Sequence, residues 1–375
     1  AGDRAGLVAR ARGARGRGAR RAGQTLKRMQ AVVFQNPGHL AVEQRSVPSA
    51  GPGEVLLRVE VAAVCQTDVH IVQGHFVVKP PRVLGHELAG EVVAVGPNVS
   101  AVRVGQQVAV NPPRFCGECV YCRRGQPQHC QRFQCLGNTA DGGWAEYALV
   151  PADQLVPLDG LTMEQAVWLE PLSCVLRAME SGERPAPENV LIVGAGPLGL
   201  LAVQVARTQG AKIVAIVDPN AGKLQRAVDL GADCAPQVSR DGVGDDADAA
   251  LGHVAPLGFD LVFDTTGKSA ALVRALRWVG RSGTIIFFGV SDPADQLTLE
   301  PALVMEKEIT LRGYAGSTPE SFDRAVALMR TGRLNTAPLI WRRVTLAELP
   351  ATVQALTQPG EKGKVFVYPN GVPAA

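Results

Sequence analysis

The 375-residue sequence contains no run approaching the roughly 18–20 consecutive apolar residues that a membrane-spanning helix needs. It also lacks an apolar secretory signal, which favours a reducing compartment and metal-binding or catalytic uses for its eight cysteines. Hydrophobic residues make up 46% of the chain, which excludes disorder for its bulk and allows two domains of ordinary size. We therefore expect a cytoplasmic protein without membrane contact.

Residues 1–28 differ in composition from the rest of the chain. They contain eight Arg, one Lys and one Asp, a net charge of +8, so residues 29–375 carry 3 − 8 = −5. Because the tail has few large apolar groups to bury, we expect it to be disordered. It lacks the interleaved aromatic residues of a nucleic-acid-binding arm and the Ser content of a transit peptide. We interpret it as upstream or non-native sequence before Met29 and predict no nucleic-acid binding.

Two patterns of hydrophobicity follow the tail. From Met29, strand-like stretches such as GEVLLRVEVAAV and LAGEVVAVG are separated by Gly and Pro. From residue 189, apolar strands alternate with helical stretches, which is the βαβ order of a parallel sheet. After about residue 316 the chain is mixed again and ends in the strand-like KVFVYP. We predict an α/β protein that combines a doubly wound parallel sheet with a β-rich domain.

The segment VLIVGAGPLGLLAVQVA carries a dinucleotide-binding pattern. Gly194, Gly196 and Gly199 form G-x-G-x-x-G directly after a strand and at the start of a helix. These glycines allow a tight turn, close approach of the pyrophosphate and helix–strand packing, and the helix dipole points at the phosphates. Asp218 ends the next strand nineteen residues after Gly199, where it would bind the ribose hydroxyls of NAD and repel the 2′-phosphate of NADP. Lys223, one helical turn further on, is compatible with either cofactor.

Residues suited to a catalytic metal are scattered over three segments. VCQTDVH contains Cys65, VLGHELAGEVVAVG contains His86 and Glu87, and WLEPLSC contains Glu170. Taken singly, such a Cys is usually a core residue, and such a His or Glu is usually exposed or hydrogen-bonded. Together, a thiolate, an imidazole and carboxylates suit a catalytic zinc site, which leaves one coordination position open.

A second group of cysteines is compact. CGECVYCRRGQPQHC has the spacing C-x2-C-x2-C-x7-C, formed by Cys116, Cys119, Cys122 and Cys130. Disulfides do not fit a chain without a secretory context. Bacterial ferredoxin motifs continue with x3-C-Pro, whereas here the last gap is seven residues and Gln131 follows. Four thiolates favour a closed, tetrahedral, structural zinc site.

The order of these motifs resembles the zinc-dependent medium-chain alcohol dehydrogenase family. Cys-x-Thr-Asp is followed after twenty-one residues by the His of Gly-His-Glu, then by the four cysteines and the dinucleotide pattern. The segment EPLS at 170–173, where other alcohol dehydrogenases have a third ligand cysteine, indicates the polyol (sorbitol-like) and threonine dehydrogenase branch. The resemblance covers residues 29–375.

The resemblance implies a domain organisation and an assembly. It places a GroES-like catalytic domain at residues 29–171 and 316–375, with a structural zinc lobe at 112–136. It places a Rossmann NAD-binding domain at 172–315. Two zinc ions per chain, one catalytic and one structural, are expected, and so is a homo-oligomer, either a tetramer or a dimer.

The resemblance also implies residue roles. Cys65 and His86 would bind the catalytic zinc, and Glu87 and Glu170 would complete the shell, one or both yielding to water or substrate. The proton pathway would comprise Asp68, which orients His86, Thr67, which accepts the alcohol proton, and His70, which passes it to solvent. The cofactor would be bound by Gly194, Gly196, Pro197, Leu198, Gly199, Asp218, Lys223, Thr266, Gly289, Val290 and Lys364, the last as a cation against the pyrophosphate.

The expected reaction is hydride transfer between a small secondary alcohol (a polyol, a diol or a hydroxy amino acid such as threonine) and NAD. Relatives close to sorbitol dehydrogenase carry an Arg in the segment aligned with GYAGS, residues 313–317, and this chain does not. Two residues keep two interpretations each: Trp144 as pocket wall or packing, and Cys174 as nicotinamide neighbour or ordinary helix residue. The alternative function is a zinc-free-type quinone reductase or a non-catalytic NAD-binding protein. The presence of both ligand sets, and of Thr67 and His70, argues against it.

Overall fold

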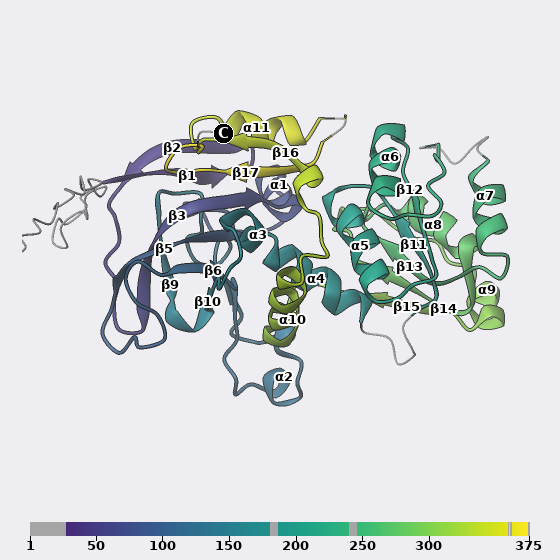
Figure 1. Ribbon diagram of the computed structural model, residues 1–375, viewed down its shortest axis with the longest axis horizontal. Helices are drawn as coiled ribbons and strands as arrows, with labels where there is room; N and C mark the ends of the chain where they lie inside the picture. The colour runs from purple at the N-terminus through teal and green to yellow at the C-terminus, as the bar shows by residue number, and fades with distance from the viewer. Residues whose placement is uncertain (1–27, 181–186, 240–245, 359, 361, 374–375) are drawn as a thin grey trace, which may run out of the picture.

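The computed structural model describes residues 28–180, 187–239, 246–358, 360 and 362–373. Apart from Arg28, the predicted basic tail lies outside the described residues. Two groups of sheets lie side by side, with helices α4 (Leu169–Met179) and α10 (Pro319–Arg330) between them (Figure 1). Within the described residues, no helix combines the length and hydrophobicity required to cross a membrane.

The first group of sheets is formed mainly by residues before 160. Its elements are β1 (Met29–Asn36), β2 (His39–Arg45), β3 (Glu54–Val64), α1 (Gln66–Gln73), β4 (Arg82–Val83), β5 (Leu88–Val95), β6 (Gln107–Val110), β7 (Pro113–Arg114), α2 (Val120–Arg123), η1 (Pro127–His129), β8 (Gln134–Cys135), β9 (Tyr147–Pro151), η2 (Ala152–Gln154) and β10 (Leu155–Pro157). The chain continues into α3 (Met163–Val167) and then α4.

Strand β3 is the centre of this β-rich part. Its sequence EVLLRVEVAAV is rich in β-branched residues and is mostly buried, as expected of a strand packed on both sides. It pairs with β5, β9 and β17 (Lys364–Val367) in a seven-stranded sheet whose path runs β10-β6-β5-β3-β17-β16. A separate three-stranded sheet has the order β2-β1-β4. The C-terminal strand β17 thus joins the β-rich part by pairing with β3.

The pairing of β17 with β3 matters for the site. Val365 pairs with Val64, and Phe366 pairs with Ala63, in antiparallel register. Lys364 therefore lies at the end of β3, beside the point where the chain turns into α1. Residues almost 300 positions apart in the sequence come together there.

The second group is the parallel sheet predicted from residue 189 onward. Its strands are β11 (Asn189–Val193), β12 (Ile213–Val217), β13 (Phe259–Asp264), β14 (Val279–Phe287) and β15 (Thr310–Gly313), in the order β12-β11-β13-β14-β15. All four pairings between them are parallel. Isolated parallel bridges, from Cys234 to Ala215 of β12 and from Gln237 to Asp218 directly after β12, extend the sheet on that side.

Helices cover both faces of this sheet. They are α5 (Pro197–Thr208), α6 (Ala221–Asp229), α7 (Ala247–Val254), α8 (Ser269–Trp278) and α9 (Pro301–Lys307). Val190 and Ile192 of β11 share a core with α5 and α6, whereas Leu191 and Val193 share a core with α7 and α8. This two-residue period, with both sides apolar, is characteristic of a doubly wound sheet and confirms the predicted fold class.

The remaining elements link the two groups. After β15 the chain forms α10, η3 (Ala337–Leu339), β16 (Ile340–Val344), α11 (Leu349–Leu356) and β17. The core of α3, α4, α5 and α10 is continuous and includes Val61 and Ala63 of β3. The sequence patterns predicted α10 and β17 but not α7, α9, β15, β16 or α11, whose apolar stretches are short.

Candidate active site

The site begins where β3 ends. Cys65 is the N-cap residue of α1, and its backbone N–H donates to Asp68 Oδ2 at 2.8 Å. Its Sγ lies 3.6 Å from the hydroxyl of Thr67, which accepts a hydrogen bond from the thiol. Asp68 is fully buried. The helix start thus holds a thiol, a hydroxyl and a carboxylate in fixed relative positions.

The second segment is held beside α1 by a tight turn. Gly85 has φ +87, and a Cβ there would lie 2.3 Å from the ring of Trp144, so only glycine fits. Trp144 is fully buried and donates its indole N–H to the carbonyl of Ala63 at 3.2 Å. Of its two interpretations, packing is therefore the one observed. Trp144 supports the turn that presents His86.

His86 faces Asp68. Its Nδ1 lies 3.6 Å from Asp68 Oδ1, and the Gly85 N–H donates to the same oxygen at 3.4 Å. Burial lowers the pKa of His86, but Asp68 and Cys65 outweigh it, so the pKa lies well above the usual histidine value. A carboxylate at Nδ1 leaves Nε2 as the nitrogen available to a ligand, as in metal sites where an acid orients the histidine.

Glu87 forms a buried ion pair with Lys364. The Lys364 ammonium lies 2.5 Å from the Glu87 carboxylate, and the two side chains are 6% and 0% exposed. Burial lowers the pKa of Lys364, but Glu87 and Cys65 outweigh it and raise the pKa above the usual lysine value. Lys364 also lies 5.7 Å from the ring centroid of Trp168. Lys364 thus contacts the predicted zinc ligand Glu87 directly, whereas the sequence analysis expected it against the pyrophosphate.

The donor set fits zinc. Ligand atoms of Cys65, His86 and Glu87 all lie within 4.8 Å of one another. A tetrahedral zinc with bonds of roughly 2.0–2.3 Å separates its ligand atoms by about 3.3–3.8 Å, so small side-chain movements suffice. Glu170 is not in this group; its carboxylate accepts the Cys174 thiol at 3.4 Å and contributes to the electrostatic field at Glu87.

The four clustered cysteines also converge. Their sulfurs lie within 4.8 Å of one another, and Sγ of Cys116 and Cys122 are 3.9 Å apart, which excludes a disulfide between them. The backbone N–H of Cys119 donates to Cys116 Sγ at 3.3 Å and lowers the pKa of that thiol to about 6. The cluster surrounds α2, in a lobe that projects from the β-rich part (Figure 1). The arrangement suits a closed zinc site that braces this lobe.

The Gly-rich turn fits a dinucleotide. Gly194 has φ +98, and a Cβ there would lie 2.7 Å from Thr265 Oγ1; a Cβ on Gly199 would lie 1.8 Å from the Gly194 carbonyl oxygen. A Cβ on Gly196 would meet nothing within 4 Å, so the space in front of the helix start is open. Pro197 is the first residue of α5, and no side chain among the described residues caps this end of the helix. The backbone N–H groups of the first turn of α5 that follow Pro197 are therefore available to bind phosphate.

Asp218 lies beside this turn. It is 7% exposed, and its two carboxylate oxygens accept the N–H groups of Ala195 and Asn220, both at 2.8 Å. The carboxylate therefore ties the end of β12 to the Gly-rich turn. Lys223, in the first turn of α6, donates its backbone N–H to the side chain of Asn220 at 3.0 Å. Asp218, the predicted ribose-binding residue, thus lies at the end of β12 and contacts the turn that follows β11.

Two further loops follow β13 and β14. The buried Asp264 accepts hydrogen bonds from the hydroxyl and N–H of Thr266, at 2.6 and 3.0 Å, and from the N–H of Gly267 at 3.0 Å. Gly289 packs so closely that a Cβ would lie 2.2 Å from the Gly267 nitrogen, and the Val290 carbonyl contacts Gly267. Thr266, Gly289 and Val290 therefore lie after the carboxyl ends of β13 and β14, and Thr266 packs against Gly194 of the Gly-rich turn. Dinucleotides bind at this edge of the sheet in this fold.

His70 connects the two parts of the site. It is the fifth residue of α1 and is half-buried. Burial, together with His75 and Lys268, lowers the pKa of His70, and Asp292 opposes this. Lys268 and Asp292 lie in the loops after β13 and β14. The charges of these two loops therefore influence His70 on the helix that begins at Cys65.

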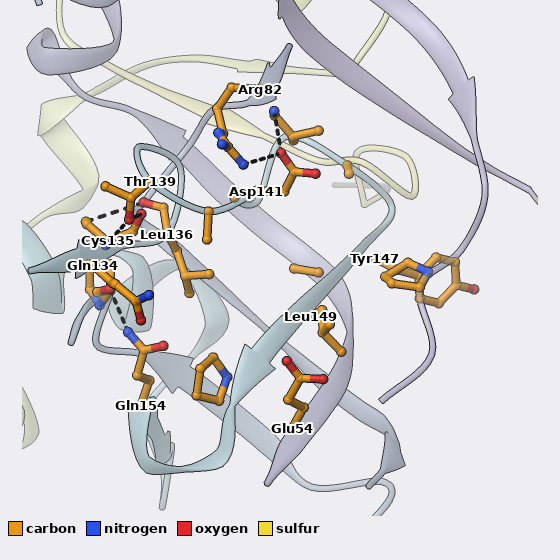
Figure 2. A pocket seen from close by; sticks show the side chains of 18 of the residues that line it. Glu54, Arg82, Gln134, Cys135, Leu136, Thr139, Asp141, Tyr147, Leu149 and Gln154 are labelled. Carbon is orange, nitrogen blue, oxygen red and sulfur yellow. Dashed lines mark hydrogen bonds and ion pairs between the residues drawn. The ribbon is translucent and has the colours of Figure 1, made fainter. Parts of the chain in front are cut away.

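A large surface cavity, of about 620 Å³, lies elsewhere. Figure 2 shows its wall, in which Arg82 and Asp141 form an ion pair of 3.2 Å. Its lining contains neither Cys65, His86 or Glu87 nor the Gly-rich turn. This cavity is therefore separate from the converging metal donors, and the donors define the candidate site.

Comparison with known proteins agrees with this geometry. The family model for the alcohol dehydrogenase GroES-like domain matches residues 51–160, and that for zinc-binding dehydrogenase matches residues 197–331. The chain is 34% identical over 350 residues to D-arabinitol dehydrogenase 1 of Uromyces fabae, covering 92% of this chain and 99% of that one. It is 33% identical over 348 residues to L-threonine 3-dehydrogenase of Pyrococcus horikoshii, covering 90% and 98%.

A solved structure agrees as well. The chain superimposes with a TM-score of 0.84 and 32% identity on a candidate zinc-binding dehydrogenase from Sinorhizobium meliloti 1021 that is bound to NADP, covering 92% of this chain and 100% of that one. The two family models together with relatives of this identity and coverage establish the relationship. The chain belongs to the zinc-binding, GroES-like alcohol dehydrogenase family, in the branch of the polyol and threonine dehydrogenases.

Proposed function

We propose that the protein is an oxidoreductase that uses zinc and transfers a hydride between a secondary alcohol and NAD. The observation that carries this proposal is the convergence of Cys65, His86 and Glu87 at the end of β3. The open Gly-rich turn of the parallel sheet supplies the second requirement, a place for the dinucleotide. Zinc acts as a Lewis acid that lowers the pKa of a bound alcohol, and NAD accepts the hydride.

We assign the catalytic zinc to Cys65 and His86, with Glu87 and Glu170 as the exchangeable carboxylates. The ion pair of Glu87 with Lys364 supports an exchangeable role, because a carboxylate shared with an ammonium binds a metal less firmly than a free one. Glu170 accepts a hydrogen bond from Cys174, which lies one helical turn further along α4. Cys116, Cys119, Cys122 and Cys130 would hold the structural zinc.

Thr67 and His70 would move the alcohol proton. The Thr67 hydroxyl lies beside the Cys65 sulfur, so an alcohol oxygen at the metal would be within its reach. His70 follows one turn later on α1 and has a lowered pKa, which keeps its ring neutral and able to accept a proton near neutral pH. Asp68 would fix the orientation of His86 from behind.

The cofactor residues follow the loops of the parallel sheet. Gly194, Gly196 and the start of α5 would hold the pyrophosphate, and Asp218 would accept the adenosine ribose hydroxyls. Asp218 already accepts two backbone N–H groups, and each carboxylate oxygen has a further lone pair for a ribose hydroxyl. NAD is proposed over NADP because a buried carboxylate repels the 2′-phosphate.

The substrate class follows from the relatives and from Arg177. The relatives are named for arabinitol and threonine, a polyol and a hydroxy amino acid. Segment 313–317 lacks an Arg of its own, but Arg177 of α4 donates to the carbonyls of Ala315 and Gly316 at 2.8 and 3.1 Å. Glu170, Cys174 and Arg177 share one face of α4, which supports a polar, hydroxylated substrate there.

Domain limits, assembly and location are also proposed. We place the catalytic domain at residues 29–171 and 316–375 and the nucleotide-binding domain at 172–315, in line with the division of the strands between the sheets. We propose a homo-oligomer, a tetramer or a dimer, by family resemblance. The eight free cysteines, with two groups placed to bind metal, support a reducing compartment such as the cytoplasm.

The test is a screen for NAD reduction by the zinc-loaded protein. The panel contains polyols, 2,3-diols, threonine and simple secondary alcohols, each measured with NAD and with NADP. The proposal expects turnover with at least one secondary alcohol, loss of that turnover on removal of zinc, and recovery on its return. Turnover of a quinone with NADPH instead, unaffected by chelators, would support the zinc-free alternative.

A further inference from the structure

A second histidine lies directly beside His70. Helix α1 ends at Gln73, its C-cap residue Gly74 has φ +83, and the chain then folds back over the last turn. The N–H of His75 donates to the His70 carbonyl at 2.9 Å, and that of Phe76 approaches the same oxygen at 3.4 Å. Only a residue that tolerates positive φ at position 74 allows this reversal. The turn therefore fixes where the His75 ring lies.

The two imidazoles are in hydrogen-bonding contact. Nδ1 of His70 lies 3.1 Å from Nδ1 of His75, and the ring centroids are 5.4 Å apart with a tilt of 40°. Such a contact requires one ring to donate and the other to accept, so the two rings share one proton at this position. If His70 donates, its Nε2 is unprotonated and able to accept a proton.

The pair runs from a half-buried ring to an exposed one. His70 is half-buried and its pKa responds to the charges of Lys268 and Asp292, whereas His75 is exposed. The ring of Phe76 lies 6.5 Å from that of His70 and covers part of it. A proton on His70 is therefore disfavoured by burial and by the positive charge of Lys268, with Asp292 opposing, and the exposed His75 ring is in contact to accept it.

We propose that His75 is the relay residue through which the alcohol proton leaves His70 for water. This inference rests on the proposed dehydrogenase function. The proton that reaches His70 Nε2 is balanced by transfer of the Nδ1 proton to His75 Nδ1. The resulting His75 imidazolium then loses one proton to water. One proton enters the pair and one leaves it, and neither an oxidant nor a reductant is involved.

The test follows the proton directly. In a single turnover of the zinc-loaded enzyme with NAD and its best alcohol, NADH absorbance and a pH-indicator dye are recorded together in weakly buffered solution. In the wild type, proton release should keep pace with NADH formation. In His75→Gln, proton release should lag about tenfold or more, consistent with the usual size of acid–base contributions. Added imidazole should remove the lag, and KM for the alcohol should not change.

The matched control is His253→Gln, an exposed histidine on α7. This variant should release its proton at the wild-type rate. A His75→Gln enzyme with undelayed proton release would overturn the proposal, and so would a lag that imidazole does not shorten. The latter would show that His75 only supports the shape of the turn.

A second measurement does not depend on turnover. In protein labelled with ¹⁵N-histidine, His75→Gln should raise the pKa of His70, because it removes a neighbouring ring that becomes cationic. An unchanged His70 titration would contradict the contact itself. If no alcohol is oxidised by the wild type, the proposed function fails and the relay with it. A raised pKa in that case would still establish the histidine pair, so the two failures are distinguishable.

Discussion

Replacing Lys364 by Met should destabilise the metal-free protein far more than an ordinary lysine substitution. The Lys364 ammonium is 6% exposed and lies 2.5 Å from the fully buried carboxylate of Glu87. The Lys364→Met variant leaves that carboxylate buried and unpaired. Breaking a buried pair on one side costs about 3–5 kcal/mol. For a chain of this size that lowers the melting temperature by on the order of 5–10 °C.

Zinc should reduce this loss. A cation bound beside Glu87 compensates the carboxylate that Lys364 no longer neutralises, so the zinc-loaded variant should lose less stability than the metal-free one. Removing the buried charge as well, in Lys364→Met combined with Glu87→Gln, should recover part of the loss in the metal-free protein. Both effects follow from the same desolvated charge.

The assay is thermal unfolding of metal-free and zinc-loaded protein. The control is Lys212→Met, which removes an exposed ion pair with Glu188 at 2.8 Å, in which both side chains are more than half exposed. An exposed pair contributes about 0–1 kcal/mol, so the control should melt close to the wild type. If Lys364→Met melted like Lys212→Met without metal, or if zinc made no difference to its loss, the argument from the buried pair would be refuted.

Three further predictions concern other parts of the chain. Cys119→Ser should lower the melting temperature and release one zinc per chain, because a closed structural zinc site contributes folding free energy. Turnover per folded chain with a zinc-loaded catalytic site should change little. A large loss of turnover at unchanged stability would contradict this. The wild type should prefer NAD over NADP by about a hundredfold or more in kcat/KM, since charged hydrogen bonds contribute ~1.5–3 kcal/mol each. Asp218→Ser combined with Pro219→Arg should shift this ratio toward NADP. An unchanged ratio would show that Asp218 does not bind the ribose. Truncation to Met29 should leave turnover and melting temperature unchanged, and salt-sensitive nucleic-acid binding lost on truncation would disprove the interpretation of the tail.

The sequence predicted the features whose information is local. The Gly-rich turn was predicted directly, because its spacing after a strand and before a helix is a local pattern; the structure shows close contacts at Gly194 and Gly199 and open space at Gly196. Cys65, His86 and Glu87 were predicted together from motif order. The alternation of apolar strands with helical stretches from residue 189 predicted a doubly wound sheet, and the two cores on either side of β11 agree with it.

Features that depend on tertiary packing were not predicted. Lys364 contacts Glu87 across 277 positions of sequence, through the pairing of β17 with β3. Trp144 was left between two roles, because only the structure shows the Gly85 turn resting on its ring. His75 carried no motif at all; a glycine directly after a helix, followed by a histidine, was the signal available. In each case the partner lies on a segment that the pattern alone does not place.

The most direct test of the account is the zinc content of wild type and Cys65→Ser measured together with NAD-linked alcohol oxidation. The account predicts two zinc per wild-type chain, one per Cys65→Ser chain, an unchanged fold by circular dichroism and no turnover in the variant. Cys65→Ser that keeps two zinc and near-normal turnover would contradict it, because the catalytic metal would then not depend on the residue at which the site begins.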